Sequence, residues 1–284
     1  MKKFFNCILL CLLLMAITPG RSLSQSLNCC VKSATAEFAL LGADEKFQSE
    51  HLAPLPFNFV PAKGKMITVK TGDGRDASGF EIRPSTPSKK YLFVFQEWWG
   101  LNDYIKQEAE NLSEELQDVN IIAPDLYDGR LATTAEEAGK MMKETKDARI
   151  RAIITAFLKH AGPEATIQTI GWCFGGGWSL QASMMAGKQT AGCVMYYGMP
   201  ETDPVKIKAI EFPVLAIFAS QDGHITPEIA RKFEKDMIEA GKNINVKFYE
   251  AEHAFANPSN PQFNREATEE AHTHAISFLR ENFK

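Results

Sequence analysis

The chain has 284 residues, of which 45% are hydrophobic and 23% charged. Its formal net charge of −4 at pH 7, from 31 basic and 35 acidic residues, excludes the strongly basic surface typical of proteins that bind nucleic acid or anionic membranes. The length fits one large domain that can bury a sizeable core.

The amino terminus has the pattern of an export signal. Lys2 and Lys3 precede an almost unbroken apolar run, residues 4–17, which is shorter than the roughly 20 residues needed to span a bilayer. Small polar residues follow, as in a secretory signal peptide cleaved near Ser24. We therefore expect residues 1–24 to be removed and the mature protein to be exported to the periplasm or the extracellular space. No later apolar run is long enough to cross a membrane, so no membrane span is expected.

The cysteines outside the leader are too sparse for a disulfide scaffold. Cys29 and Cys30 are adjacent, and the residues before them loosely resemble a lipid-attachment site, so a lipid anchor is an alternative to a freely soluble form. Cys193 lies in an apolar, strand-like run and is expected to be a small buried hydrophobe. Cys173 requires a separate explanation.

Strands and helices alternate along most of the chain. Residues 25–61 form a predicted N-terminal extension with one short helix near residues 35–50. From residue 62, short apolar strands are expected at residues 65–70, 91–96, 120–123, 166–170, 192–197, 214–219 and 245–249. Helices are expected at residues 104–116, 134–160, 175–186, 227–240 and 265–282, and a hairpin turn at residues 72–74 (Gly-Asp-Gly). This alternation predicts a single α/β domain, residues 62–284, with a doubly wound, mostly parallel sheet.

The strongest functional signal follows the strand at residues 166–170, because open α/β sheets bind ligands at the carboxyl ends of their strands. Residues 171–175 (Gly-Trp-Cys-Phe-Gly) have the glycine spacing of a nucleophile elbow, with Cys173 in place of serine. The helix that begins after Cys173 favours its thiolate form, and the backbone N–H of Phe174 is placed to bind an oxyanion. The alternative is a glycine-rich turn that holds an ordinary buried cysteine.

A thiol nucleophile needs a base and an orienting acid, which follow it in the order acid, histidine. Asp222 and His253 come directly after the strands at residues 214–219 and 245–249, so both are expected at the same sheet edge. His253 can take the thiol proton while Asp222 fixes its tautomer. His224 competes as base, but it shares the Asp222 loop and would leave His253 unexplained. The remaining histidines are expected to be solvated or helix-terminal: His51, His160, His272 and His274.

From about Met66 to its end, the sequence resembles the dienelactone hydrolase family of α/β-hydrolases. The likeness rests on residues 96–102 (Gln-Glu-Trp-Trp-Gly-Leu-Asn), 123–127 (Ala-Pro-Asp-Leu-Tyr), the cysteine elbow, and the segments that contain Asp222 and His253. The resemblance implies a Cys173–Asp222–His253 triad.

The resemblance also gives a role to Glu97, as a carboxylate that controls protonation of the thiol, and to the backbone N–H of Trp98, which would complete the oxyanion hole with Phe174. Glu97 has its own physical rationale. A carboxylate at a strand end beside Trp98 and Trp99 is expected to be partly desolvated, which raises its pKa. The alternative is that Glu97 only caps the following helix.

The sequence departs from the family where dienelactone-cleaving members bind the substrate carboxylate with arginines. Arg130, near Tyr127, is one place off the family spacing, and both residues are candidates for substrate binding. The second arginine is replaced by Asn257, which cannot make a bidentate charged contact. Arg265, in the next segment, is a candidate to take the place of this second arginine. A small ester or lactone is therefore expected, without dienelactone being specified.

These features together predict an exported carboxylic ester hydrolase that works through an acyl-thioester intermediate on a small-molecule ester or lactone. No metal-ligand spacing or phosphate-binding loop is evident, so no metal or cofactor is expected, and no nucleic-acid partner. One alternative is an exported binding protein with a catalytically idle site. Another is a thiol redox protein, although no second cysteine lies at Cys-x-x-Cys spacing from Cys173.

Overall fold

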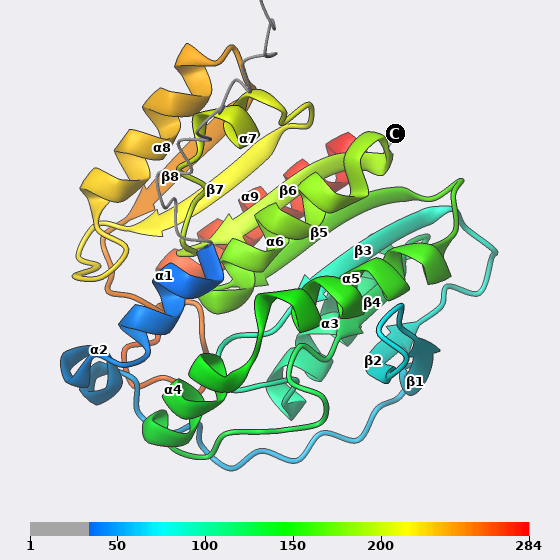
Figure 1. The fold of residues 1–284 in the computed structure, drawn as a ribbon, viewed down its shortest axis with the longest axis horizontal. Helices are drawn as coiled ribbons and strands as arrows, with labels where there is room; N and C mark the ends of the chain where they lie inside the picture. Colours follow the sequence, from blue (N-terminus) through cyan, green and yellow to red (C-terminus); the bar gives the residue numbers. More distant parts are fainter. Residues whose placement is uncertain (1–33, 284) are drawn as a thin grey trace, which may run out of the picture. The chain divides into compact units, whose positions relative to one another are not determined.

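The predicted parallel sheet forms the centre of the molecule. The computed structural model describes residues 34–283, so the expected signal peptide, Cys29 and Cys30 lie outside the described residues. The described chain folds around an eight-stranded sheet with strand order β1-β2-β4-β3-β5-β6-β7-β8 (Figure 1). The strands are β1 (Lys65–Lys70), β2 (Asp76–Ile82), β3 (Lys90–Phe95), β4 (Asn120–Pro124), β5 (Thr166–Trp172), β6 (Thr190–Tyr196), β7 (Val214–Ala219) and β8 (Ile244–Tyr249).

Strand pairing confirms the doubly wound, mostly parallel arrangement. All neighbouring pairs from β4 through β8 are parallel, whereas β2 pairs antiparallel with both β1 and β4. The predicted turn at residues 72–74 joins β1 to β2, and Gly74 adopts the positive φ of 81° that such a turn requires. Strands β4 and β7 are buried along their whole length, as expected where helices cover both faces of a sheet.

Helices cover both faces of this sheet. In Figure 1, α5 and α6 lie in front of the strands, and α3 and α9 lie behind them. The helices are α1 (Ala34–Leu41), α2 (Glu45–Glu50), α3 (Asp103–Leu116), α4 (Ala135–Glu144), α5 (Asp147–Ala161), α6 (Phe174–Ala186), α7 (Pro204–Lys208), α8 (Pro227–Glu239) and α9 (Arg265–Asn282), with a 3-10 turn at Gly187–Gln189. Within the described residues, none of these helices combines the length and apolar character needed to span a membrane.

Two expected helices are each divided in the structure. The helix expected at residues 134–160 is α4 and α5, because the backbone of Thr145 is extended. The Thr145 hydroxyl donates to the carbonyl of Met141 and so ends α4 without a glycine or proline to mark the break. The helix expected near residues 35–50 is α1 and α2, and the Asp44 side chain caps α2 by accepting from the backbone N–H of Phe47.

Strand β2 was not expected from the sequence. It contains an aspartate, a serine and Gly79, residue types that are depleted in strands. Gly79 is required there, because a side chain at this position would collide with the ring of Phe157. Tertiary packing therefore overrides local propensity in β2, and short α7 was missed as well.

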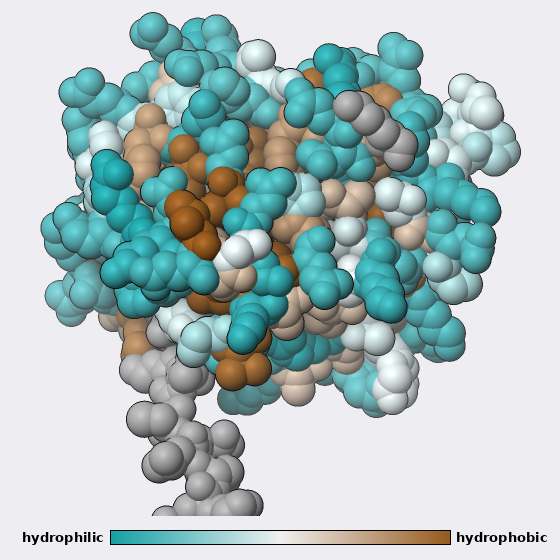
Figure 2. Space-filling model, turned by 90° about the horizontal axis from the view of Figure 1, so that it is seen from above, coloured by the Kyte–Doolittle hydropathy of each residue, from teal (hydrophilic) through white to brown (hydrophobic). Residues whose placement is uncertain are grey.

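The surface is largely polar. The face in Figure 2 is mainly hydrophilic, with apolar residues gathered in a limited area near its centre. This surface agrees with a chain whose apolar side chains lie mostly in one core cluster around the sheet.

Candidate active site

The turn between β5 and α6 holds Cys173 in a strained conformation. Its φ of 57° and ψ of −118° are unusual for a residue other than glycine. Side chains at Gly171 or Gly175 would collide with neighbouring backbone, at Gly175 with the carbonyls of Phe95 and Gln96 at the end of β3. The two glycines therefore allow the elbow to sit against β3, with the thiol at the amino end of α6.

Cys173, His253 and Asp222 form a continuous contact chain at the carboxyl ends of β5, β8 and β7. The Sγ atom of Cys173 lies 3.3 Å from Nε2 of His253, and Nδ1 of His253 lies 2.6 Å from Oδ2 of Asp222. The second carboxylate oxygen of Asp222 accepts from the backbone N–H groups of His224 and Ile225, at 2.8 and 2.9 Å. The side chains of Cys173, His253 and Asp222 are all buried.

The electrostatics of these residues follow from their burial and their contacts. Burial raises the pKa of the Cys173 thiol, and nearby His253 only partly opposes this. Burial alone would lower the pKa of His253, but the carboxylate of Asp222, together with the sulfur of Cys173 when it is ionised, raises it well above its ordinary value. Cys173 at rest is therefore a thiol beside a strongly basic imidazole.

Glu97 follows β3 and lies close enough to influence the same thiol. Burial raises the pKa of Glu97 to about 7, whereas His253 and the side-chain amide of Asn257 act in the opposite direction. Oε2 accepts a hydrogen bond from Nδ2 of Asn257. Oε1 is buried and has no hydrogen-bond partner among the described residues. Glu97 does not act as a helix cap, because Asn102 caps α3.

The predicted binding residues are not all gathered at this site. The rings of Trp98 and Tyr127 are fully buried; Trp98 contacts Phe47 and Tyr127 stacks on Phe174 at 5.5 Å. Arg130 points elsewhere, because its guanidinium donates to Glu144 and to Thr145 at 3.0 Å each. Arg265, the other arginine considered, lies beside Glu269 on α9.

The N-terminal extension reaches over the triad, which the sequence did not indicate. In Figure 1, α1 and α2 lie at the edge where the parallel strands end. The ring of Phe38 contacts Phe174, and the ring of Phe47 contacts those of Trp98 and His253 at centroid distances of 5.0 and 5.8 Å. The buried rings of Phe38 and Phe47 thus cover the nucleophile, and Cys173 is only 1% exposed.

His51, expected to be solvated or helix-terminal, is the residue that ends α2, and it is buried. Its ring lies 4.0 Å from that of Phe47 and 5.2 Å from that of His253. The helix-terminal position is confirmed, whereas the burial of His51 could not be predicted, because it depends on α2 folding back over the sheet edge. His224 points away from the thiol, since its Nε2 lies 2.6 Å from Oε2 of Glu50.

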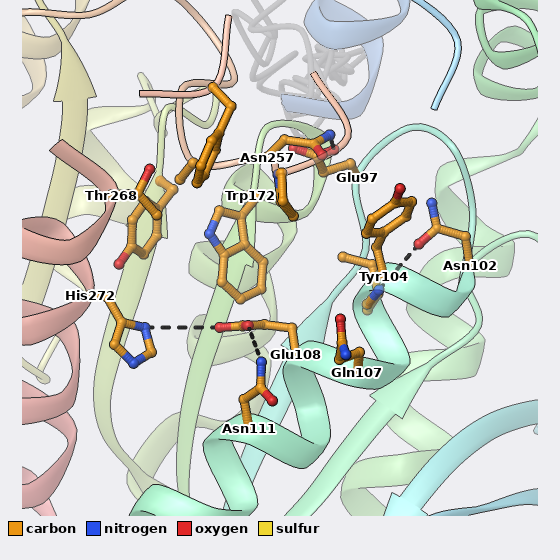
Figure 3. Close-up of a pocket in the computed structure, with 15 residues that line it drawn as sticks. Glu97, Asn102, Tyr104, Gln107, Glu108, Asn111, Trp172, Asn257, Thr268 and His272 are labelled. Atoms are coloured by element: carbon orange, nitrogen blue, oxygen red, sulfur yellow. Dashed lines mark hydrogen bonds and ion pairs between the residues drawn. The ribbon is translucent and has the colours of Figure 1, made fainter. Parts of the chain in front are cut away.

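Glu97 also lines a cavity of about 200 Å³ (Figure 3). Figure 3 shows carboxylates of Glu97 and Glu108 and the rings of Trp172 and Tyr104 around it. His272, also expected to be solvated, lines this cavity and pairs with carboxylates of α3. Among the described residues that line it, none is lysine or arginine. The cavity is therefore aromatic and acidic.

Comparison with known proteins supplies a family for this site. The family model described as "Dienelactone hydrolase family" matches residues 78–283. Carboxymethylenebutenolidase 1 of Cupriavidus pinatubonensis is 25% identical over 231 residues, which are 76% of this chain and 95% of that protein. The carboxymethylenebutenolidase of a Pseudomonas species is 25% identical over 232 residues, 77% of this chain and 94% of that protein.

Solved structures share the fold. A dienelactone hydrolase-like promiscuous phosphotriesterase from metagenomic libraries superposes with a TM-score of 0.67 at 20% identity, covering 78% of this chain and 99% of the other. An esterase of Pyrococcus furiosus gives a TM-score of 0.60 at 17% identity, covering 83% and 98%. These likenesses confirm the predicted α/β-hydrolase architecture.

Proposed function

This chain belongs to the dienelactone hydrolase family and is a hydrolase of carboxylic esters, and we propose that it cleaves a small, neutral ester or lactone through Cys173. The observation that carries the proposal is the contact chain from Sγ of Cys173 through the imidazole of His253 to the carboxylate of Asp222. A nucleophile, a base and an orienting acid in this order can perform two-step acyl transfer.

The first step is attack of the Cys173 thiolate on the ester carbonyl. Because burial keeps the resting residue a thiol, a proton must leave it when substrate binds. His253 takes that proton with the assistance of Glu97, whose pKa of about 7 suits proton transfer near neutrality. The backbone N–H groups of Trp98 and Phe174 bind the oxyanion, and the C–O bond to the leaving group then breaks as the alkoxide receives a proton from His253.

The second step is hydrolysis of the acyl-thioester. His253 takes a proton from water, which attacks the acyl carbonyl and restores the thiol of Cys173 as the acid leaves. A thiolate is a better leaving group than an ordinary alkoxide, so unactivated alkyl esters tend to revert at the first step. Enol esters and enol-lactones, which release a stabilised leaving group, are the favoured substrates.

The charge of the cavity beside Glu97 bears on whether the substrate is neutral or anionic. Glu97 and Glu108 line this cavity, and no lysine or arginine is among its described lining residues. The guanidinium of Arg130 is engaged by Glu144 and Thr145. An anionic acyl group would meet carboxyl groups there, and the imidazole of His272 that also lines the cavity already pairs with Glu108 and Glu115, which supports a neutral substrate over a carboxylate-bearing lactone.

Export is part of the proposal and has its own test. Its support is the basic start and short apolar run of residues 1–24. Expression of the full chain followed by amino-terminal sequencing of the mature protein should find a start near residue 25. An unprocessed cytoplasmic product would contradict export.

Pre-steady-state hydrolysis of p-nitrophenyl acetate tests the nucleophile. The parent and Cys193→Ala, a control that removes the other buried free thiol of the described chain, should show a burst followed by turnover. Cys173→Ala should show neither. Equal activity of Cys173→Ala and the parent would rule out the thiol nucleophile. Absence of activity in the parent with this ester and with a panel of neutral lactones would favour an idle binding site.

A further inference from the structure

Three side chains that can bind a metal converge where the N-terminal extension meets the triad. A nitrogen of His51, Sγ of Cys173 and a nitrogen of His253 all lie within 4.8 Å of one another, and the three residues are buried. They come from the end of α2, the β5–α6 elbow and the segment after β8. No ligand spacing in the sequence reveals this set, because the three positions are far apart along the chain.

The hydrogen bonds of both imidazoles point to the same ring nitrogen as the metal ligand, and in His253 that nitrogen already faces Sγ of Cys173. Nδ1 of His253 contacts the Asp222 carboxylate, and Nδ1 of His51 contacts the carbonyl of Phe47 at 2.6 Å. A carbonyl or carboxylate can only accept, so Nδ1 carries a hydrogen in each ring. Nε2 of His51 keeps its lone pair, and a metal would displace the proton shared between Nε2 of His253 and Sγ of Cys173. Histidines that bind zinc have this same arrangement, with the other ring nitrogen donating to a carboxylate or carbonyl.

Nε2 of His51 is a buried polar atom without a hydrogen-bond partner in the described part of the chain. The His51 side chain is only 4% exposed, and its burial beside His253 lowers its pKa to about 3, so the ring is neutral. Leaving such an atom unpaired costs free energy, because water has been removed without replacement. A ligand that accepts its lone pair would remove that cost.

The distances fit a tetrahedral ion after a small movement. A zinc ion bound at about 2.3 Å to sulfur and about 2.0 Å to nitrogen separates its ligand atoms by about 3.3 to 3.6 Å. Sγ of Cys173 and Nε2 of His253 are already 3.3 Å apart. His51 would move toward them by up to about 1.5 Å, a shift within reach of a side chain at the end of a six-residue helix.

A cavity adjoins the two histidines of this cluster. It has a volume of about 120 Å³ and is lined by His51 and His253 together with Glu50, Glu252 and Lys46. Thiolate and imidazole are ligands that Zn²⁺ prefers, whereas Mg²⁺ and Ca²⁺ prefer oxygen. The cluster therefore offers ligands suited to zinc, and its two imidazoles border a cavity.

We propose that His51, Cys173 and His253 form a reversible Zn²⁺ site in which the metal occupies the catalytic thiol and blocks ester hydrolysis. Binding forms one Zn–S and two Zn–N bonds, and the Cys173 thiol releases its proton to solvent. Water takes the fourth position. The N-terminal extension thereby supplies a ligand that the triad alone lacks, and chelation of the zinc restores the free thiol. The blocking of hydrolysis rests on the proposed function, whereas metal binding does not.

Cobalt and zinc titrations of the purified mature protein test the site. The metal-free parent should bind one Co²⁺ with a thiolate-to-cobalt charge-transfer band, release one proton per ion and lose esterase activity to Zn²⁺, with recovery in EDTA. His51→Phe keeps the ring that contacts Phe47, and His51→Asn can keep a donor to its carbonyl. Both should bind Zn²⁺ about 100-fold more weakly, and Cys173→Ser should lack the charge-transfer band.

His274→Ala removes a more exposed histidine of α9 and should bind Zn²⁺ as the parent does. Equal zinc affinity in the parent and in correctly folded His51→Phe and His51→Asn would overturn the proposal, as would equal weakening in His274→Ala. If the parent lacks esterase activity yet shows the His51-dependent cobalt band, the proposed function fails while the metal site stands.

Discussion

Asn257 donates a hydrogen bond from its side-chain amide to the carboxylate of Glu97, across 160 positions of the chain. At this position the family resemblance leads one to expect a substrate-binding arginine, but here the side chain serves a protein carboxylate. Burial raises the pKa of Glu97 to about 7, and the Asn257 amide acts in the opposite direction by stabilising the charged form. Asn257 therefore helps to set the protonation state of Glu97.

Replacement of Asn257 by leucine should move the pH dependence of catalysis. Without the amide, the ionised form of Glu97 loses a hydrogen bond, and its pKa rises by roughly one unit. The acidic limb of the pH profile of kcat/KM should shift upward by the same amount. The matched control is Asn111→Leu, because Asn111 donates to Glu108 in the same cavity. A limb that stays in place in Asn257→Leu would show that Glu97 does not govern it.

Glu97→Gln should change how stability depends on pH. The carboxyl has an ordinary pKa of 4.5 when unfolded and about 7 when folded, so the folded state binds more protons between these values. Its contribution to stability is thus greatest below pH 4.5 and is lost as the pH rises through 7. The free energy of unfolding of Glu97→Gln minus that of the parent should therefore be about 3 kcal/mol larger above pH 8 than at acidic pH.

Urea denaturation of both proteins at several pH values measures this difference. Glu201→Gln provides a control of opposite sign. Burial favours its protonated form, but hydrogen bonds from Asp203, Gln181 and Lys206 outweigh burial and lower its pKa. That variant should lose stability relative to the parent as the pH rises. A pH-independent difference for Glu97→Gln would mean that Glu97 has no raised pKa in the folded protein.

The parts of the site that follow local rules could be predicted from the sequence. Strand and helix patterns indicated the elements that end at Asp222 and His253, and the glycine spacing indicated the turn at Cys173. Since the carboxyl ends of parallel strands share one edge, these residues were expected together, and the contact distances place them so.

Other parts depend on contacts that no local pattern specifies. The burial of His51 requires α2 to fold back over β5 and β8, and the partner of Asn257 lies on another strand end. Arg130 was a candidate for substrate binding, but its guanidinium donates to Glu144, the last residue of α4, and to Thr145, which follows it. In each case the missing information was which side chains, far apart in the sequence, contact one another in the fold.

Arg149→Met should destabilise the protein by about 2 kcal/mol, because it removes a buried guanidinium whose hydrogen bonds join the buried Thr71 hydroxyl to Asp73 and Asp128. The guanidinium of Arg149 on α5 binds Asp73 in the β1–β2 turn and Asp128 after β4. It is only 8% exposed. Arg151→Met is the control, because the side chain of Arg151 is 36% exposed and pairs with Asp147 one turn away, and its loss should cost about 1 kcal/mol or less. Equal unfolding midpoints in urea would contradict the prediction.

Phe47→Ala should expose the nucleophile without unfolding the domain. Phe47 is fully buried, and its ring contacts Phe38, Trp98 and His253. Removing a buried phenylalanine ring costs about 3 kcal/mol or more, and here that cost falls on the short α1–α2 cover, which can open locally. Labelling of Cys173 by iodoacetamide should therefore accelerate at least about tenfold, since each 1.4 kcal/mol changes an opening equilibrium by that factor.

Peptide mapping by mass spectrometry distinguishes this local opening from general loss of stability. Cys193 lies in the core between β6 and α6, so its labelling reports on opening of the whole domain. Phe57→Ala is the matched control, because Phe57 is 38% exposed and stacks only on Tyr104 at the surface. We expect Phe47→Ala to accelerate the labelling of Cys173 but not of Cys193, and Phe57→Ala to accelerate neither. Equal acceleration at both cysteines would instead mean that Phe47 stabilises the entire fold and does not act as a separable cover.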